Sequence, residues 1–200
     1  VARMEHEGLR PGAGPVAVRA DPEPFLPYPR IVERNGRLEW QYERPQSVGK
    51  VRAFYGNFAI LVRAYAYMLA NGGDGLTAVT EGAVLAANYV RARLRDLYFL
   101  PYETDSLHEV VFSDKHQART GVRTLDIAKR LLDFGFHAPT IYFPLVVPGA
   151  LMIEPTETES VETLDAFIEV MRAIAAEAES DPAKVQAAPT TTPRARLDET

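Results

Sequence analysis

The sequence has no cysteine and carries a formal net charge of -5 over 200 residues. Without cysteine there is no disulfide framework, no thiolate nucleophile and no cysteine-ligated zinc or iron–sulfur site, and this absence suits a reducing compartment such as the cytoplasm. The small acidic excess gives no general attraction for nucleic acid or for an anionic membrane, because both favour a basic face. We therefore expect a cytoplasmic protein that binds neither nucleic acid nor membrane.

The sequence also lacks a long apolar run. The longest stretch, residues 58–70, is 13 residues long and contains Arg63, whereas a membrane-spanning helix needs roughly 20 apolar residues. It therefore predicts a buried helix. The amino terminus has neither an initiating Met nor an apolar signal core, so we expect the chain to begin within a longer protein.

Proline and glycine are concentrated in residues 1–50, which predicts a loop-rich arm. Two short runs in this arm, residues 14–18 and 30–33, are candidates for a pair of strands, although such a pair buries little surface.

Residues 51–97 predict two connecting helices. The first, residues 51–70, is apolar almost all round, as in a helix that is covered by other parts of a larger protein. Its tyrosines, Tyr55, Tyr65 and Tyr67, then predict core packing. Residues 71–73 end this helix, and Asp74 is a candidate N-cap for a second helix that runs to about Asp96.

Strand and helix patterns alternate in residues 98–188. Strands are expected near residues 109–112, 140–143 and 150–153, with a helix over 124–134 that Gly135 closes and a last helix with Ser160 as its N-cap. Residues 189–200 form a polar tail that we expect to be frayed. The fold class is therefore α/β, with a small α+β carboxy-terminal domain.

Several segments carry a family resemblance, in order and spacing. They are PGAGPV at residues 11–16, GNF at 56–58, LVRAYAY at 61–67, GVRTLDIAKRLLDFGFH at 121–137, PTIYFPL at 139–145 and ALMIEPTETES at 150–160. Together they resemble the carboxy-terminal half of the second-subunit type of glycine decarboxylase, the P-protein of the glycine cleavage system. The resemblance covers nearly the whole chain and implies the carboxy-terminal part of a fold-type-I pyridoxal-phosphate-dependent transferase.

The resemblance implies a cofactor loop at the amino terminus. In the family, a His-Lys pair opens this loop and the lysine forms the internal aldimine with pyridoxal phosphate. His6 occupies the position of the histidine that precedes the glycines, and Gly12 and Gly14 end the loop, so these three are the predicted cofactor-binding residues. The lysine would fall just before Val1, and residues 7–10, which the family pattern expects to be glycine, are mostly other types. We therefore expect this chain alone to be inactive.

The resemblance also implies a substrate or lipoyl channel. Its predicted residues are His137, Pro139, Thr140, Glu154 and Thr156. The implied partners are glycine, the first-subunit type of glycine decarboxylase and the lipoylated carrier protein. In the complete enzyme, pyridoxal phosphate would be the electron sink for decarboxylation, and the aminomethyl group would pass to the lipoyl disulfide.

Structural explanations remain open for these channel residues. A loop histidine such as His137 often makes only structural hydrogen bonds. Thr156 and Glu159 have capping-box spacing at the start of the last helix. His108 and Glu109 open a strand, and no further metal ligands stand nearby in the sequence.

The lysines that are present do not fit the aldimine role. Lys50, Lys115, Lys129 and Lys184 all lie in contexts that predict solvated side chains. The segment SVGKV at residues 47–51 lacks the upstream glycine of a phosphate-binding P-loop. The resemblance therefore implies a fragment of glycine dehydrogenase (aminomethyl-transferring). The alternative is a non-catalytic remnant or interaction module that pairs with a separate lysine-bearing half.

Overall fold

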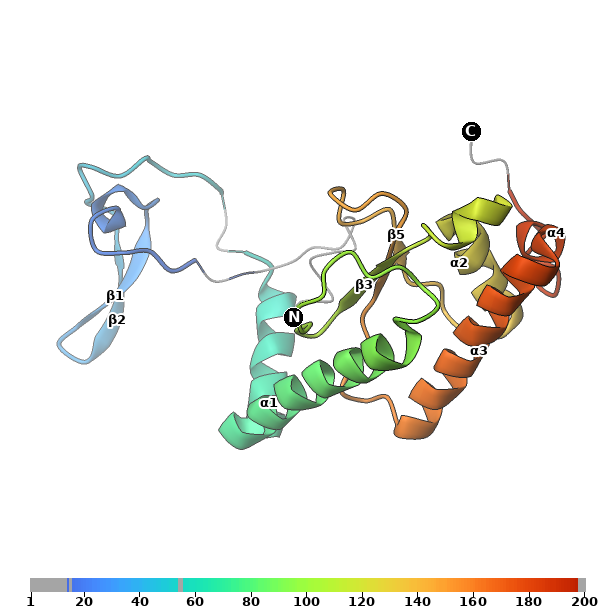
Figure 1. The fold of residues 1–200 in the computed structure, drawn as a ribbon. Coiled ribbons are helices and arrows are strands. Elements are labelled where there is room, and N and C mark those ends of the chain that lie inside the picture. The colour runs from blue at the N-terminus through green and yellow to red at the C-terminus, as the bar shows by residue number, and fades with distance from the viewer. Residues whose placement is uncertain (1–13, 15, 54–55, 198–200) are drawn as a thin grey trace. The chain divides into compact units, whose positions relative to one another are not determined.

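The structure, a computed structural model, describes residue 14, residues 16–53 and residues 56–197. It divides into two compact units, Val1–Gly72 (unit 1) and Gly73–Thr200 (unit 2), which are described separately (Figure 1). The four-part division expected from the sequence, 1–50, 51–97, 98–188 and 189–200, stays a prediction. No helix within the described ranges has both the length and the apolar character that a membrane crossing requires.

Unit 1 contains a β-hairpin. A short 3-10 helix, η2 (Glu23–Phe25), precedes strands β1 (Arg30–Arg34) and β2 (Arg37–Gln41), which pair antiparallel with Arg34 opposite Arg37. The two turn residues, Asn35 and Gly36, both have positive φ, 52° and 74°, as a type I′ turn requires. The predicted strand at residues 14–18 is wrong, because its described residues have no regular structure and β2 is the partner of β1.

Helix α1 (Phe58–Leu94) is interrupted at Gly72, where φ is 64° and ψ is -174°. Glycine adopts this backbone conformation without the steric cost of a Cβ, so the predicted break between two helices is confirmed. The first helix begins at Phe58 and not at residue 51.

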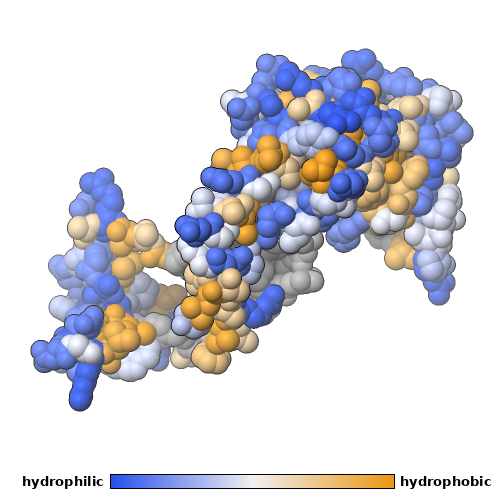
Figure 2. All heavy atoms as spheres, turned by 90° about the horizontal axis from the view of Figure 1, so that it is seen from below, coloured by the Kyte–Doolittle hydropathy of each residue, from blue (hydrophilic) through white to orange (hydrophobic). Residues whose placement is uncertain are grey.

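The part of α1 that precedes Gly72 is exposed. Phe58 and Leu69 are 79% and 65% exposed, and Tyr65 and Tyr67 are exposed as well. The expected burial of this helix, and the core packing of its two described tyrosines, are therefore wrong for the chain by itself. Tyr55 lies outside the described residues. Apolar side chains also form orange areas on the surface seen in Figure 2.

Unit 2 is built around a three-stranded antiparallel sheet. The order is β3 (Val110–Ser113), β5 (Ala150–Ile153) and β4 (Thr140–Ile141). Val110 is opposite Ile153, and Thr140 is opposite Met152. The predicted strand at 150–153 is confirmed, whereas the strand expected at 140–143 is shorter because Tyr142 has a φ of 60° and leaves the extended conformation.

One hydrophobic core holds unit 2 together. Its helices are the part of α1 after Gly72, α2 (Thr124–Asp133), α3 (Val161–Ser180) and the short α4 (Pro182–Gln186), with the 3-10 helix η3 (Gln117–Thr120). Strand residues Val110, Phe112 and Leu151 share this core with Leu131 and Ile168 from the helices. Burial of such side chains is the main favourable term in folding. The expected small α+β domain is therefore confirmed.

The helix starts differ in part from the predictions. Ser160 caps α3, because its hydroxyl accepts a hydrogen bond from the Thr163 N–H at 3.2 Å, as expected. The capping box of Thr156 and Glu159 is wrong, because both residues lie in a turn before the helix, where the Glu159 N–H donates to the Thr156 carbonyl.

The start of α2 uses a distant carboxylate. The Asp114 side chain accepts a hydrogen bond from the Thr124 N–H at 3.0 Å, and the Thr124 hydroxyl donates to the Gly149 carbonyl at 2.7 Å. Gly149 has a φ of 63°, and a Cβ there would lie 2.1 Å from Asp114 Oδ1. Only glycine therefore allows this close approach.

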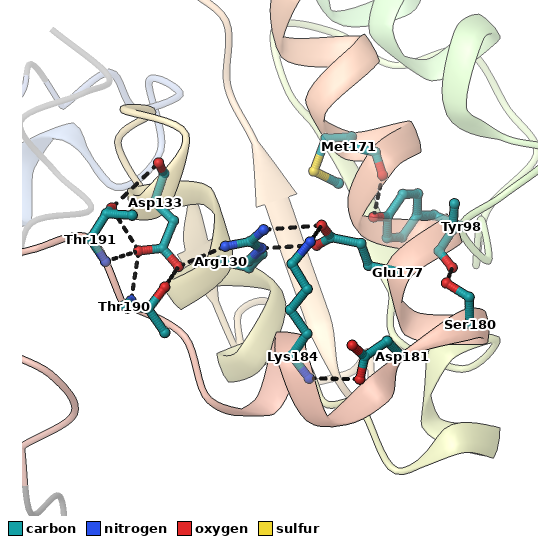
Figure 3. A network of polar contacts seen from close by, with 11 residues as sticks. Tyr98, Arg130, Asp133, Met171, Glu177, Ser180, Asp181, Lys184, Thr190 and Thr191 are labelled. Atoms are coloured by element: carbon teal, nitrogen blue, oxygen red, sulfur yellow. Dashed lines mark hydrogen bonds and ion pairs between the residues drawn. The ribbon is translucent and has the colours of Figure 1, made fainter.

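The segment after α4 is anchored to α2, so the expectation of a frayed tail is wrong for its described part. Asp133 accepts hydrogen bonds from the N–H groups of Thr190 at 2.7 Å and Thr191 at 2.8 Å (Figure 3). Farther on, the Arg196 guanidinium donates to Asp126 at 2.6 Å. These long-range bonds tie a polar sequence to the helix.

Candidate functional site

The predicted cofactor-binding residues are not brought together in the described structure. His6 and Gly12 lie outside the described residues, and Gly14 is exposed without regular structure. Of the predicted channel residues, His137 is exposed in the loop before β4, Pro139 is half-buried and Thr140 is exposed in β4.

One end of the sheet gathers polar side chains. Glu154 directly follows β5, and Glu109 directly precedes β3; since Ile153 is opposite Val110, the two glutamates flank the same end of this strand pair. His108 Nε2 lies 3.5 Å from Glu154 Oε1 and 4.0 Å from Glu109 Oε2. We call His108, Glu109 and Glu154 the sheet-end cluster. Thr140 pairs with Met152, two residues before Glu154.

Backbone contacts hold both sides of the cluster. The Asn88 side chain of α1 donates to the Ser106 carbonyl at 2.7 Å and accepts from the Ser106 N–H at 3.0 Å. The backbone at His108 is therefore held between Ser106, through its two hydrogen bonds with Asn88, and the start of β3. Glu154 stands between Ile153 and Pro155, which are both buried.

The cluster combines two carboxylates with one imidazole, and all three side chains are partly exposed, at 24% to 39%. Its chemistry is that of hydrogen-bond acceptance and proton exchange, because a glutamate accepts and an imidazole nitrogen donates or accepts according to its tautomer. Within the described ranges, no group of three or more His, Cys, Asp or Glu side chains could hold a metal ion.

Thr156 and Glu157 lie beside the cluster in sequence. The Thr156 hydroxyl is hydrogen-bonded to the Thr158 hydroxyl at 2.7 Å, and Glu157 packs at 3.6 Å from the position of a Cβ built on Gly82 in α1. The turn that carries Thr156 therefore contacts α1.

A second polar network has a structural role. Arg130 of α2 donates two hydrogen bonds to Glu177 of α3, at 2.9 Å and 3.0 Å (Figure 3), and these bonds lower the pKa of Glu177. Burial alone would raise the pKa of Asp133, but hydrogen bonds from Thr191, Thr190 and Arg130 outweigh it and lower that pKa to about 2. The network joins α2, α3 and the anchored tail.

Tyr98 is a buried member of the core. Its hydroxyl donates to the Met171 carbonyl at 2.8 Å (Figure 3), and burial raises the pKa of the phenol. A buried tyrosine commonly finds such a partner. We assign Tyr98 a structural role.

His108 and Glu109 are the cluster residues that the sequence pattern did not predict, and His108 is the one whose ring nitrogen lies near both glutamates. In the sequence it stands only as half of a possible metal motif at the start of a predicted strand. Forty-six positions separate His108 from Glu154 in the sequence, so only the pairing of β3 with β5 shows that they meet. A signal was present nonetheless, because His108-Glu109 opens one predicted strand and Glu154 ends another.

A family model described as "Glycine dehydrogenase, C-terminal domain" matches residues 79–192. The chain belongs to the glycine dehydrogenase family. It is 60% identical over 196 residues to the probable glycine dehydrogenase (decarboxylating) subunit 2 of Lysinibacillus sphaericus. It is 58% identical over 195 residues to the protein of the same description from Bacillus velezensis. The family resemblance stated from the motifs is confirmed.

The chain spans about 40% of the length of these two relatives, while 98% of the chain is matched in each case. Among solved structures, glycine decarboxylase (P-protein) of the glycine cleavage system in inhibitor-bound form matches with a TM-score of 0.58 at 18% identity. That match covers 78% of this chain and 37% of the other. This glycine dehydrogenase family member therefore shares the fold of the corresponding part of a P-protein.

Proposed function

We propose that this chain is the carboxy-terminal part of a glycine dehydrogenase (decarboxylating) subunit 2, which acts on glycine in the glycine cleavage system. The observation that carries the proposal is the 60% identity to a probable subunit 2 over 98% of the chain. In this function, unit 2 supplies the small carboxy-terminal domain and part of the wall of the active site.

The cofactor of the complete enzyme is proposed to be pyridoxal phosphate, which would supply an electron sink. The described residues do not by themselves fit this group, because aldimine formation needs a lysine of lowered pKa in a desolvated or cationic setting. Lys50 and Lys115 are exposed, and Lys184 is paired with Glu177 at 2.5 Å. Lys129, expected to be solvated, is half-buried and has a partner. The aldimine lysine is therefore proposed to come from other sequence.

The substrate or lipoyl channel is proposed to include His137, Pro139, Thr140, Glu154 and Thr156. Support comes from Glu154, which is half-buried, carries a carboxylate and lies at an end of the sheet where His108 and Glu109 converge. The exposure of His137 and Thr140 leaves both side chains accessible to another molecule. The proposed partners are the first-subunit type of the enzyme and the lipoylated carrier protein, in the cytoplasm.

A chimaera tests the function directly. In the Lysinibacillus sphaericus relative, the segment that matches this chain is replaced by this chain, and the chimaera is assayed for glycine–bicarbonate exchange with the first subunit, lipoylated carrier protein and pyridoxal phosphate. We expect exchange activity, and the relative with the segment deleted is the negative control. A chimaera with native-like thermal unfolding but no exchange would contradict the proposal and favour the remnant or interaction module.

The chain by itself tests the cofactor argument. Incubation with pyridoxal phosphate followed by borohydride reduction is expected to leave no specific adduct, because none of its four lysines has the required setting. Peptide mass mapping checks each lysine, with the chimaera as the positive control. A stoichiometric adduct on one lysine of the isolated chain would overturn the assignment of the aldimine to other sequence.

A further inference from the structure

His108 is placed to act on Glu154. The same imidazole nitrogen, Nε2, lies 3.5 Å from a Glu154 oxygen and 4.0 Å from a Glu109 oxygen. One N–H can donate well to only one of these carboxylates at a time. Glu154 is the nearer, so the imidazole is better placed to orient Glu154 than Glu109.

Two atoms of the cluster are shielded from solvent and lack a hydrogen-bond partner in the described structure, His108 Nε2 and Glu109 Oε2. Such atoms are rare in native structures because each costs the desolvation free energy of a polar group. A small rotation of the Glu154 side chain would turn the 3.5 Å contact into a hydrogen bond. A hydrogen bond formed in this way would couple the position of the Glu154 carboxylate to the imidazole.

The backbones on the two sides are held independently of this contact. Ser106 is clamped by Asn88 in both directions, two residues before His108. Ile153 and Pro155, on either side of Glu154, are buried. Loss of the imidazole should therefore free the Glu154 side chain without moving the chain that carries it.

We infer that His108 is a positioning residue that fixes the orientation of the carboxylate of Glu154, a residue of the proposed channel, with Glu109 near the same ring nitrogen. This inference rests on the proposed function, because it deepens the role of Glu154 there. His108 itself need not touch substrate. Its effect on the reaction passes through Glu154.

The first test is a double-mutant cycle in the chimaera. His108→Leu is expected to lower kcat/KM for glycine–bicarbonate exchange by about tenfold to a hundredfold, as misplacement of a site group by about 1 Å can do. Combined with Glu154→Ala, it should add no more than about a twofold further loss, since two residues that act through one contact are not additive. Fully multiplicative losses, or an unchanged kcat/KM for His108→Leu, overturn the inference.

Rescue separates positioning from general damage. His108→Gln keeps an N–H donor near the place of Nε2 and should retain most of the exchange activity that His108→Leu loses. His116→Gln is the matched control, because the His116 ring contacts Leu97 and Phe99 and not the cluster. Equal losses for His108→Gln and His108→Leu count against the inference.

A stability measurement tests the contact between His108 and Glu154 without relying on enzymatic activity. In urea unfolding of the 200-residue chain, the effects of His108→Leu and Glu154→Ala on the unfolding equilibrium should deviate from multiplicativity by about twofold or more. Independent effects overturn the contact. An unmodified chimaera without exchange overturns the proposed function, whereas an active chimaera that His108→Leu leaves unaffected overturns this inference alone.

Discussion

The two units differ in the burial of their apolar side chains. No described residue of unit 1 is buried, whereas all the buried apolar side chains of the described chain lie between Ala86 and Pro189 in unit 2. Both units are rich in large apolar residues, and unit 1 exposes Leu38, Phe58 and Leu69 at 76%, 79% and 65%. Apolar composition alone therefore does not make a core.

The difference lies in the elements that are available to cover a face. In unit 2, helices pack against a three-stranded sheet, so that Phe112 and Ile168 belong to one hydrophobic core. Unit 1 has a two-stranded hairpin, and a hairpin alone buries too little to be stable. Extended exposed apolar surface of this kind is typical of regions that contact another polypeptide.

The largest expected loss of stability comes from a substitution in the core of unit 2. Phe112 is fully buried between strand and helices, and Phe112→Ala should lower the free energy of unfolding by about 3–5 kcal/mol, because transfer and cavity terms add. Phe58→Ala removes the same atoms from a side chain that is 79% exposed, so its effect should stay within about 0.5 kcal/mol. Urea unfolding of both variants measures the comparison, and similar losses would show that the exposure of Phe58 does not describe the chain in solution.

The next largest loss of stability is expected at Gly149, and a comparison with Gly36 distinguishes the cost of backbone strain from the cost of close packing. Gly149 in unit 2 and Gly36 in unit 1 have similar positive φ values, 63° and 74°, but only at Gly149 would a Cβ meet another group, Asp114 Oδ1 at 2.1 Å. Gly149→Ala should cost about 2–4 kcal/mol, the sum of left-handed strain and overpacking. It also displaces the carboxylate that caps α2.

Gly36→Ala is the matched control for that variant. Its Cβ would meet no atom within 4 Å, so only the left-handed strain of about 1–2 kcal/mol remains. This loss should appear as faster amide exchange in β1 and β2, while urea unfolding measures the loss at Gly149. If Gly149→Ala costs no more than Gly36→Ala, the close approach to Asp114 has no energetic importance.

The third prediction concerns pH. The pKa of Asp133 is lowered from 3.8 to about 2, and its side chain is only 1% exposed. A lowered carboxyl pKa stabilises the fold above the unfolded-state pKa, and that stability, about 2 kcal/mol, is lost as the pH falls from about 4 through about 2.

Asp133→Asn should remove most of this pH dependence, because the amide cannot ionise and accepts fewer hydrogen bonds from Thr190 and Thr191. Thermal unfolding between pH 2 and 7 measures it. Glu23→Gln in unit 1 is the comparison, since Glu23 pairs with Arg44 at 3.0 Å but is 39% exposed, and solvent screens such a pair. An equal acid dependence in Asp133→Asn and the unchanged chain would show that Asp133 is not the group responsible.

The regular elements of unit 2 could be predicted because their signals are local. Helix α3 followed from apolar spacing and a serine N-cap, and the break at Gly72 followed from paired glycines. The hairpin of unit 1 also has a local signal, because Asn35-Gly36 between two short runs is typical of a two-residue hairpin turn and indicates β2.

The long-range contacts of the sheet-end cluster and of the anchored tail could not be predicted in this way. His108 meets Glu154, and Asp133 meets Thr190, across 46 and 57 positions. Such pairs follow from strand register and helix packing, which the sequence pattern does not specify. The exposure of residues 58–70 could not be predicted from the sequence either, because an apolar run has the same pattern whether or not another surface covers it.

The smallest expected loss of stability is at the start of α3, where the side chains of unit 2 are exposed, as they are in most of unit 1. Ser160 is exposed, and its hydroxyl accepts a hydrogen bond from the Thr163 N–H at 3.2 Å. Ser160→Ala should cost about 1 kcal/mol, because the N–H loses its protein acceptor. Thr158→Ala, in the same exposed turn, removes a hydroxyl that bonds only to Thr156 in the described structure, and its effect should stay within about 0.5 kcal/mol. Urea unfolding compares the two variants, and equal costs would mean that Ser160 stabilises the turn before α3 and not the helix itself.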